Sequence, residues 1–274
     1  MAADKGKQFE YAIMIAALSR LPKEMMVNSI KTAYADLMIK TAKGTSIEKD
    51  VKQAARKMID EIEPQTGRNN FYKSFKQLGG GAGGGGEPKT DILFVLSGKK
   101  YKCSLKWGDK YQLSSGGISN TTEVFKKVLA NSKKIQGKTA KEIASFIVEF
   151  ENTLGALPKR GEQNVMKAAI GKNTHLKEKL ENLLGSRKSL EVADAYKSFK
   201  DEIVKESLTG QLMFGKSNDK SADYILNEKE LKPINAALIK SVSDITYVRL
   251  RLKGRGQTDK GVRLNEIVVT IEPK

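Results

Sequence analysis

Two side chains that could carry out a hydrolysis stand at the ends of a short two-strand pattern. Asp91 opens the apolar run ILFVL, and Lys106 closes the alternating run KKYKCSLK. Gly98 lies between the runs and suits a hairpin turn, so we expect neighbouring strands that bring Asp91 and Lys106 side by side. Hydrolysis of a phosphodiester by metal-activated water needs oxygen ligands for Mg²⁺ and a cation beside that water. Asp91 and Lys106 meet this need.

The two expected strands differ in how many of their faces should be buried. Residues 92–96 are continuously apolar, which is typical of a strand buried on both faces. Residues 99–106 alternate between apolar and polar side chains. Ser104 and Lys106 therefore share the polar face of the second strand.

The segment EPKTD, followed by the triplet SLK, resembles the motif of the PD-(D/E)XK nuclease superfamily, which includes many type II restriction endonucleases and phage and repair nucleases. The resemblance implies that Asp91 is the first metal ligand and that Lys106 orients or deprotonates the attacking water. It also implies a ligand on the first core helix, where Glu10 in GKQFEYAIMIAAL has the expected place. Ser104 departs from the pattern, because the family has a second acidic ligand at that position. The implied cofactor is Mg²⁺ or Mn²⁺.

Two further residues belong to the same hypothesis. Glu206, in KESLTGQLMFG at the end of a helical pattern, is a second candidate for the carboxylate that Ser104 does not supply. A solvated glutamate at a helix end is the alternative. Gln112, in WGDKYQLSSGG, would orient water or a phosphate, and an ordinary loop glutamine explains it equally well.

The charge of the chain favours a polyanionic partner. The sequence has 49 Lys and Arg against 32 Asp and Glu, a net charge of +17. Such an excess attracts phosphates and releases their counterions on contact. The basic residues are spread along the chain rather than gathered on one amphipathic helix, so nucleic acid is favoured over acidic lipid. The nuclease hypothesis makes duplex DNA the expected partner, although the sequence alone leaves DNA and RNA open. The residues expected to grip phosphates surround the loop of the last hairpin: Lys253, Arg255, Lys260 and Arg263.

The rare residues exclude several kinds of site. Cys103 is the single cysteine, so a disulfide framework and a cysteine-based zinc finger are excluded. His175 is the single histidine and lies in a helical surface pattern, so we expect an exposed bystander rather than a member of a catalytic triad. No run approaches the roughly 20 apolar residues of a membrane span. We expect an intracellular, cytoplasmic protein without membrane contacts; the sequence leaves a monomer and a homodimer both open.

Helical periodicity covers residues 6–62 and returns from 120 to 206. The glycine run at 79–86 is either a linker or a mobile loop at the lip of a site. The predicted fold is α/β, with a restriction-endonuclease-like mixed sheet flanked by helices and a large helical insertion. Four segments are expected: an N-terminal helical part of the core at 1–78, ending in a short helix at 69–78; catalytic strands at 87–119; a helical subdomain at 120–206; and, at 207–274, a helix over 227–242 and two strands that complete the core.

The first hypothesis is a metal-dependent endonuclease that acts on DNA, either restriction-like or encoded by a phage. A second is a non-catalytic nucleic-acid-binding or phage structural protein that keeps a degenerate nuclease fold, and Ser104 is its chief support. A basic RNA-associated protein is a third, although it would have no use for the pair Asp91 and Lys106. In the plainest alternative, Asp91 caps a strand and Lys106 is a solvated charge.

Overall fold

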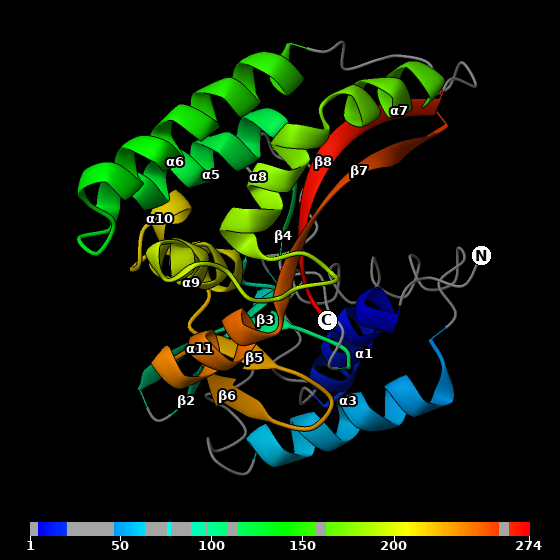
Figure 1. The fold of residues 1–274 in the computed structure, drawn as a ribbon. Helices are drawn as coiled ribbons and strands as arrows, with labels where there is room; N and C mark the ends of the chain where they lie inside the picture. Colours follow the sequence, from blue (N-terminus) through cyan, green and yellow to red (C-terminus); the bar gives the residue numbers. More distant parts are fainter. Residues whose placement is uncertain are drawn as a thin grey trace. The chain divides into compact units, whose positions relative to one another are not determined.

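The computed structural model in Figure 1 describes residues 5–20, 47–63, 76–77, 89–96, 98–108, 114–156, 163–257 and 263–274. The chain divides into two compact units. The first unit comprises Met1–Asp109 and Phe214–Ile234, and the second comprises Lys110–Met213 and Asn235–Lys274. The fold is mixed α/β, with both antiparallel and parallel strand pairs. In the part of the chain that the structure describes, no helix is long and apolar enough to cross a membrane.

A mixed sheet is the centre of the first unit. The order of its strands is β1-β2-β3-β5-β6. The bounds are β1 (Lys76–Gln77), β2 (Ile92–Leu96), β3 (Lys99–Leu105), β5 (Tyr224–Leu226) and β6 (Leu231–Pro233). β2 and β3 form the predicted antiparallel hairpin. β5 comes from far along the chain and pairs with β3 in parallel.

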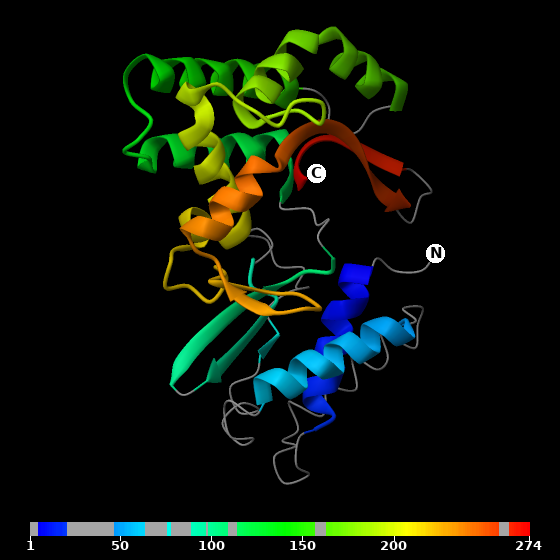
Figure 2. The ribbon, with the colours of Figure 1, turned by 60° about the horizontal axis from the view of Figure 1, so that its bottom comes forward.

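Two helices cover one face of this sheet. α1 (Lys5–Leu18) and α3 (Lys49–Ile62) cross each other within the first unit, as Figure 2 shows. α3 buries one stripe at helical spacing, whereas α1 is apolar around most of its circumference and is buried on most sides. Both helices share a core with the sheet residues Ile92, Phe94, Cys103, Leu105 and Leu226. Each large side chain buried there contributes roughly 1.5–3 kcal/mol to stability.

The second unit combines a helical layer with a separate sheet. Its strands follow the order β4-β8-β7, with β4 (Ser114–Gly117), β7 (Thr246–Gln257) and β8 (Arg263–Pro273). The helices are α5 (Ile118–Asn131), α6 (Gly137–Phe150), α7 (Gln163–Lys172), α8 (Thr174–Leu184), α9 (Asp194–Thr209) and α11 (Ala236–Asp244), with a π-helical turn at Glu151–Gly155. α5, α7 and α8 pack against this sheet. The short α10 (Gln211–Phe214) follows α9.

The hairpin, the first helix and the helical character of residues 120–206 were predicted correctly. Two predicted helices were not. Within the predicted helix at 69–78, Lys76 and Gln77 form the edge strand β1, and the other residues lie outside the described ranges, as does the glycine run at 79–86.

The predicted helix at 227–242 begins only at Ala236. Pro233 closes β6 on the sheet edge, where a residue without a backbone N–H is tolerated. Asn235 then caps α11, because its side-chain Oδ1 accepts a hydrogen bond from the Leu238 N–H at 2.9 Å. The last two strands also differ from the prediction. They pair with β4 in their own sheet instead of completing the sheet that holds β2 and β3.

Gly185 offers a test of packing in the second unit. It ends α8 with φ +86 and ψ 150, a backbone region that is essentially restricted to glycine. A Cβ there would lie 2.8 Å from the Leu190 carbonyl oxygen and 3.0 Å from that of Thr246. We predict that Gly185→Ala destabilises the second unit by more than about 3 kcal/mol, since backbone strain and overpacking add.

Gly137→Ala is the matched control, because φ is +61 and no atom lies within 4 Å of the added Cβ. It should cost only the strain of the backbone, about 1–2 kcal/mol. Urea unfolding followed by circular dichroism measures both losses. Equal losses would contradict the packing described around Gly185.

Candidate active site

Asp91 lies directly before β2 and is held by the backbone of β3. Its N–H donates to the Cys103 carbonyl oxygen at 2.9 Å, which continues the register in which Ile92 pairs with Cys103. Asp91 therefore faces Ser104 across the hairpin. The carboxylate oxygen Oδ2 accepts a hydrogen bond from the Leu105 N–H at 2.6 Å and a longer one from the Ser104 hydroxyl at 3.3 Å. Two donors thus fix one oxygen of the carboxylate.

The other carboxylate oxygen of Asp91, Oδ1, accepts no hydrogen bond from any residue that the structure describes. Carboxylate oxygens are the ligands that Mg²⁺ and Ca²⁺ prefer, and the two bonds to Oδ2 hold the carboxylate in one orientation.

Lys106 is positioned by the parallel strand. Its backbone N–H donates to the Leu226 carbonyl oxygen at 2.9 Å, so β5 fixes the end of β3. The side-chain ammonium forms no hydrogen bond or ion pair within the described ranges, but its charge acts on Asp91 and favours the ionised carboxylate.

Glu10 comes from α1 and is 8% exposed. Its negative charge also acts on Asp91, in the direction opposite to that of Lys106. α1 is anchored to the end of β3 through Trp107, whose ring centroid lies 5.4 Å from that of Phe9 and 5.6 Å from the Lys5 ammonium. Packing next to Lys106 thus brings the Glu10 carboxylate toward the site.

These surroundings raise the pKa of Asp91 from its ordinary value near 3.8 to about 6. Burial is the largest cause, because the charged carboxylate loses water, and the Glu10 charge acts in the same direction. The Lys106 ammonium, the Leu105 N–H and the Ser104 hydroxyl oppose the rise. A half-buried carboxylate with a raised pKa beside a lysine is typical of a functional site.

The residues present fit a divalent cation bound by few protein ligands. Asp91 and Glu10 offer oxygen ligands from two different elements, and Mg²⁺ is commonly held by one or two carboxylates, with waters and substrate phosphates completing its shell. Within the described ranges, no three Asp, Glu, His or Cys residues gather closely enough to hold a metal. Ser104 does not replace the missing carboxylate, since its hydroxyl is engaged with Asp91.

Glu206 belongs to the second unit, and backbone contacts account for its burial. Its two carboxylate oxygens accept hydrogen bonds from the Leu212 N–H at 2.7 Å and the Met213 N–H at 3.0 Å. These N–H groups begin α10, whose first donors have no partner within the helix. The carboxylate thus caps α10.

The remaining sequence candidates are less fully described. Gln112 and Lys260 lie outside the described residues. Lys253 and Arg255 fall on β7 and Arg263 on β8, where only their strand pairing is described. Arg251, on the same strand, was not singled out from the sequence; its Nε donates to the Thr270 hydroxyl at 2.8 Å.

His175 is exposed, as expected, and its ring contacts Glu149 at 3.0 Å. The contribution of β5 to the site was also missed. Its only sequence signal is the short run YIL at 224–226.

Comparison with family models, with curated proteins and with solved structures finds no match to this chain.

The raised pKa of Asp91 predicts a particular dependence of stability on pH. An acid whose pKa is higher in the folded state favours folding below its unfolded pKa, and this contribution is lost as the pH rises through the folded pKa near 6. Asp91→Asn removes the ionisation and keeps an oxygen acceptor for the Leu105 N–H. We predict that the variant gains stability relative to the parent protein by about 2–3 kcal/mol between pH 4 and pH 8.

Trp107 is the single tryptophan of the sequence, so its fluorescence during urea unfolding in EDTA reports on the first unit. Asp50→Asn is the matched control in the same unit. Hydrogen bonding to Lys5 lowers the pKa of Asp50, so its pH trend should have the opposite sign. A stability difference for Asp91→Asn that stays constant with pH would contradict the raised pKa of Asp91.

Proposed function

We propose that the protein is a metal-dependent nuclease that hydrolyses phosphodiester bonds of DNA on a core of the PD-(D/E)XK type. The observation that carries this proposal is the cluster formed by Asp91, Glu10 and Lys106. The Glu10 carboxylate and the Lys106 ammonium both act electrostatically on the Asp91 carboxylate at the end of a mixed sheet. The antiparallel pair β2–β3, the parallel neighbour β5 and α1 on one face support a restriction-endonuclease-like core.

Each residue of the cluster has a definite task. Asp91 and Glu10 hold the cation, with the Leu105 N–H and the Ser104 hydroxyl fixing the orientation of Asp91. When bound, Mg²⁺ or Mn²⁺ lowers the pKa of a bound water and polarises the phosphate. Lys106 orients the attacking water and stabilises the negative charge that develops on the phosphate.

The charge of the protein supports a nucleic-acid substrate. The net charge of +17 favours association with phosphates through counterion release. The β7–β8 hairpin carries the basic residues that we assign to backbone contacts: Lys253, Arg255, Lys260 and Arg263. Such contacts position the DNA and carry no sequence information, so they fit a nuclease of any specificity.

A second candidate is a non-catalytic DNA-binding protein with a degenerate nuclease core. Ser104 favours it, because a neutral hydroxyl stands across the hairpin from Asp91 where a carboxylate would strengthen metal binding. The absence of a third acidic ligand among the described residues favours it too. The two candidates differ in metal-dependent cleavage and share salt-sensitive DNA binding.

Cleavage of supercoiled and linear duplex DNA in Mg²⁺, Mn²⁺ or EDTA tests the proposal. We predict cleavage that requires the metal and falls at least about 100-fold in Asp91→Ala and in Lys106→Ala, since each removes a group with a direct chemical task. Lys232→Ala is the matched control, because this partly exposed lysine lies on β6 of the same sheet and, among the described residues, forms its ion pair with Glu230.

Binding measured by fluorescence anisotropy at several salt concentrations should change little in the two site variants. If no metal supports cleavage while all variants bind DNA equally well, the nuclease proposal fails and the degenerate binding protein takes its place.

A further inference from the structure

Lys102 is a buried cation next to the candidate site. It lies on β3 and alternates with Lys100 and Ser104, yet its side chain is only 5% exposed. A buried ammonium is unfavourable unless its three N–H donors are satisfied. Hydrogen-bond acceptors must therefore surround the Lys102 ammonium.

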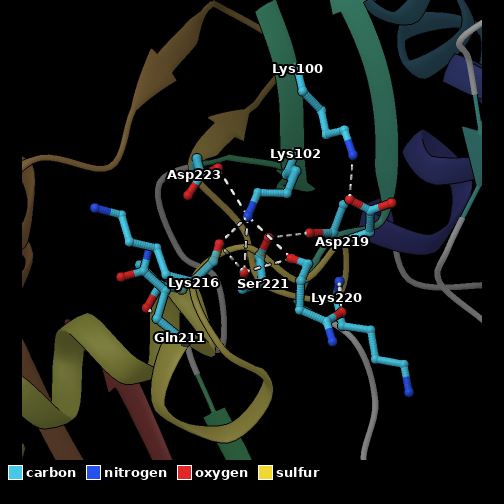
Figure 3. A network of polar contacts seen from close by, with 11 residues as sticks. Lys100, Lys102, Gln211, Lys216, Asp219, Lys220, Ser221 and Asp223 are labelled. Carbon is cyan, nitrogen blue, oxygen red and sulfur yellow. Dashed lines mark hydrogen bonds and ion pairs between the residues drawn. The ribbon is translucent and has the colours of Figure 1, made fainter.

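The loop at 215–223 supplies that environment, as Figure 3 shows. The Lys102 ammonium donates to the Lys216 carbonyl oxygen at 2.7 Å, to the Asn218 carbonyl oxygen at 3.2 Å and to the Ser221 hydroxyl at 3.0 Å. It also pairs with the Asp223 carboxylate at 3.1 Å. The Ser221 hydroxyl donates in turn to the Asn218 carbonyl oxygen at 2.8 Å, so the loop closes around the cation.

The same loop holds the segment from which Asp91 projects. The Lys220 carbonyl oxygen accepts the Lys89 N–H at 2.8 Å and the Thr90 N–H at 3.2 Å. The Thr90 hydroxyl, which is fully buried, donates to the Ser221 carbonyl oxygen at 2.8 Å. These bonds fix the two residues immediately before Asp91.

The loop also leads into the strand that fixes Lys106. The Asp223 N–H donates to the Lys102 carbonyl oxygen at 2.9 Å, and β5 begins at the next residue. β5 then accepts the Lys106 N–H through Leu226. One buried cation thus orders backbone on both sides of the candidate site.

We propose that Lys102 is a positioning residue of this site, because it folds the 215–223 loop that holds Thr90 before Asp91 and leads into β5 beside Lys106. The inference rests on the proposed nuclease function for its kinetic consequence. Its structural consequence, an ordered segment before Asp91, is independent of catalysis.

Lys102→Met tests the inference by two readouts in the full-length protein. In cleavage of duplex DNA with Mg²⁺, the variant should lose at least about tenfold in kcat and change KM by less than about twofold, because misplaced catalytic groups affect the reaction more than binding. In hydrogen exchange followed by NMR, the Thr90 and Leu105 amides should exchange at least about tenfold faster. The Ile59 amide in α3 should keep its protection.

Lys100→Met is the matched control. It removes a positive charge from the same strand, and Lys100, like Lys102, contacts the 215–223 loop. Lys100 differs in that its side chain is half exposed and pairs with the half-exposed Asp219 at 2.9 Å. This variant should keep kcat within about twofold and leave the Thr90 exchange unchanged. Equal effects of Lys100→Met and Lys102→Met would overturn the inference, because charge alone would then explain both.

If Trp107 fluorescence shows that Lys102→Met unfolds the first unit, Thr90→Val replaces it as the test variant. It removes only the bond to Ser221, and it should lower kcat and accelerate exchange at Leu105 in the same direction. Unchanged exchange at Thr90 and Leu105 in a folded Lys102→Met protein overturns the inference, whatever happens to kcat. If the parent protein cleaves no DNA, the proposed function fails, and the exchange comparison still decides the role of Lys102.

Discussion

The backbone of β3 holds Asp91 from two sides, and the rest of the candidate site depends on this contact. The Cys103 carbonyl oxygen accepts the Asp91 N–H, and the Leu105 N–H donates to the Asp91 carboxylate. This register places Asp91 opposite Ser104 and leaves Oδ1 without a described donor. A shift of one residue would move every side chain of the hairpin to the opposite face. The long apolar run of β2 and the packing of Cys103 and Leu105 against α1 and α3 specify the register.

The charged groups of the site lower the stability of the folded protein, and the apolar core around them restores it. Burial raises the pKa of Asp91, and Glu10 adds a like charge from α1. The buried apolar side chains of α1 and α3 offset these costs, since each stabilises the fold by roughly 1.5–3 kcal/mol. Lys102 follows the same logic at the neighbouring position, where backbone carbonyls and one carboxylate satisfy a buried ammonium. Charged groups in such partly buried surroundings interact more strongly than they would in water.

The sequence predicts the local parts of this arrangement. Alternation in 99–106 and the apolar run before it predict the hairpin, and the apolar periodicity predicts α1. β5 and β6 are not predictable in the same way, because each has only three residues and is stabilised by pairing with distant parts of the chain. Lys100 and Lys102 cannot be told apart from the sequence, since both occupy the polar face of β3. Lys102 is buried by the 215–223 loop, which reaches it through contacts between distant parts of the chain.

The roles of Glu10 on α1 and Glu206 on α9 also could not be predicted from the sequence. From the sequence Glu10 is the first candidate for the missing carboxylate and Glu206 the second, and only the structure shows that the Leu212 and Met213 N–H groups engage Glu206 as a cap. Calorimetric titration of Mn²⁺ into the parent protein, Asp91→Asn, Glu10→Gln and Glu206→Gln tests the central claim most directly. We expect Mn²⁺ binding to weaken at least about tenfold in Asp91→Asn and Glu10→Gln and to be unchanged in Glu206→Gln. No binding by the parent protein, or binding that depends on Glu206 and not on Asp91, would contradict that claim.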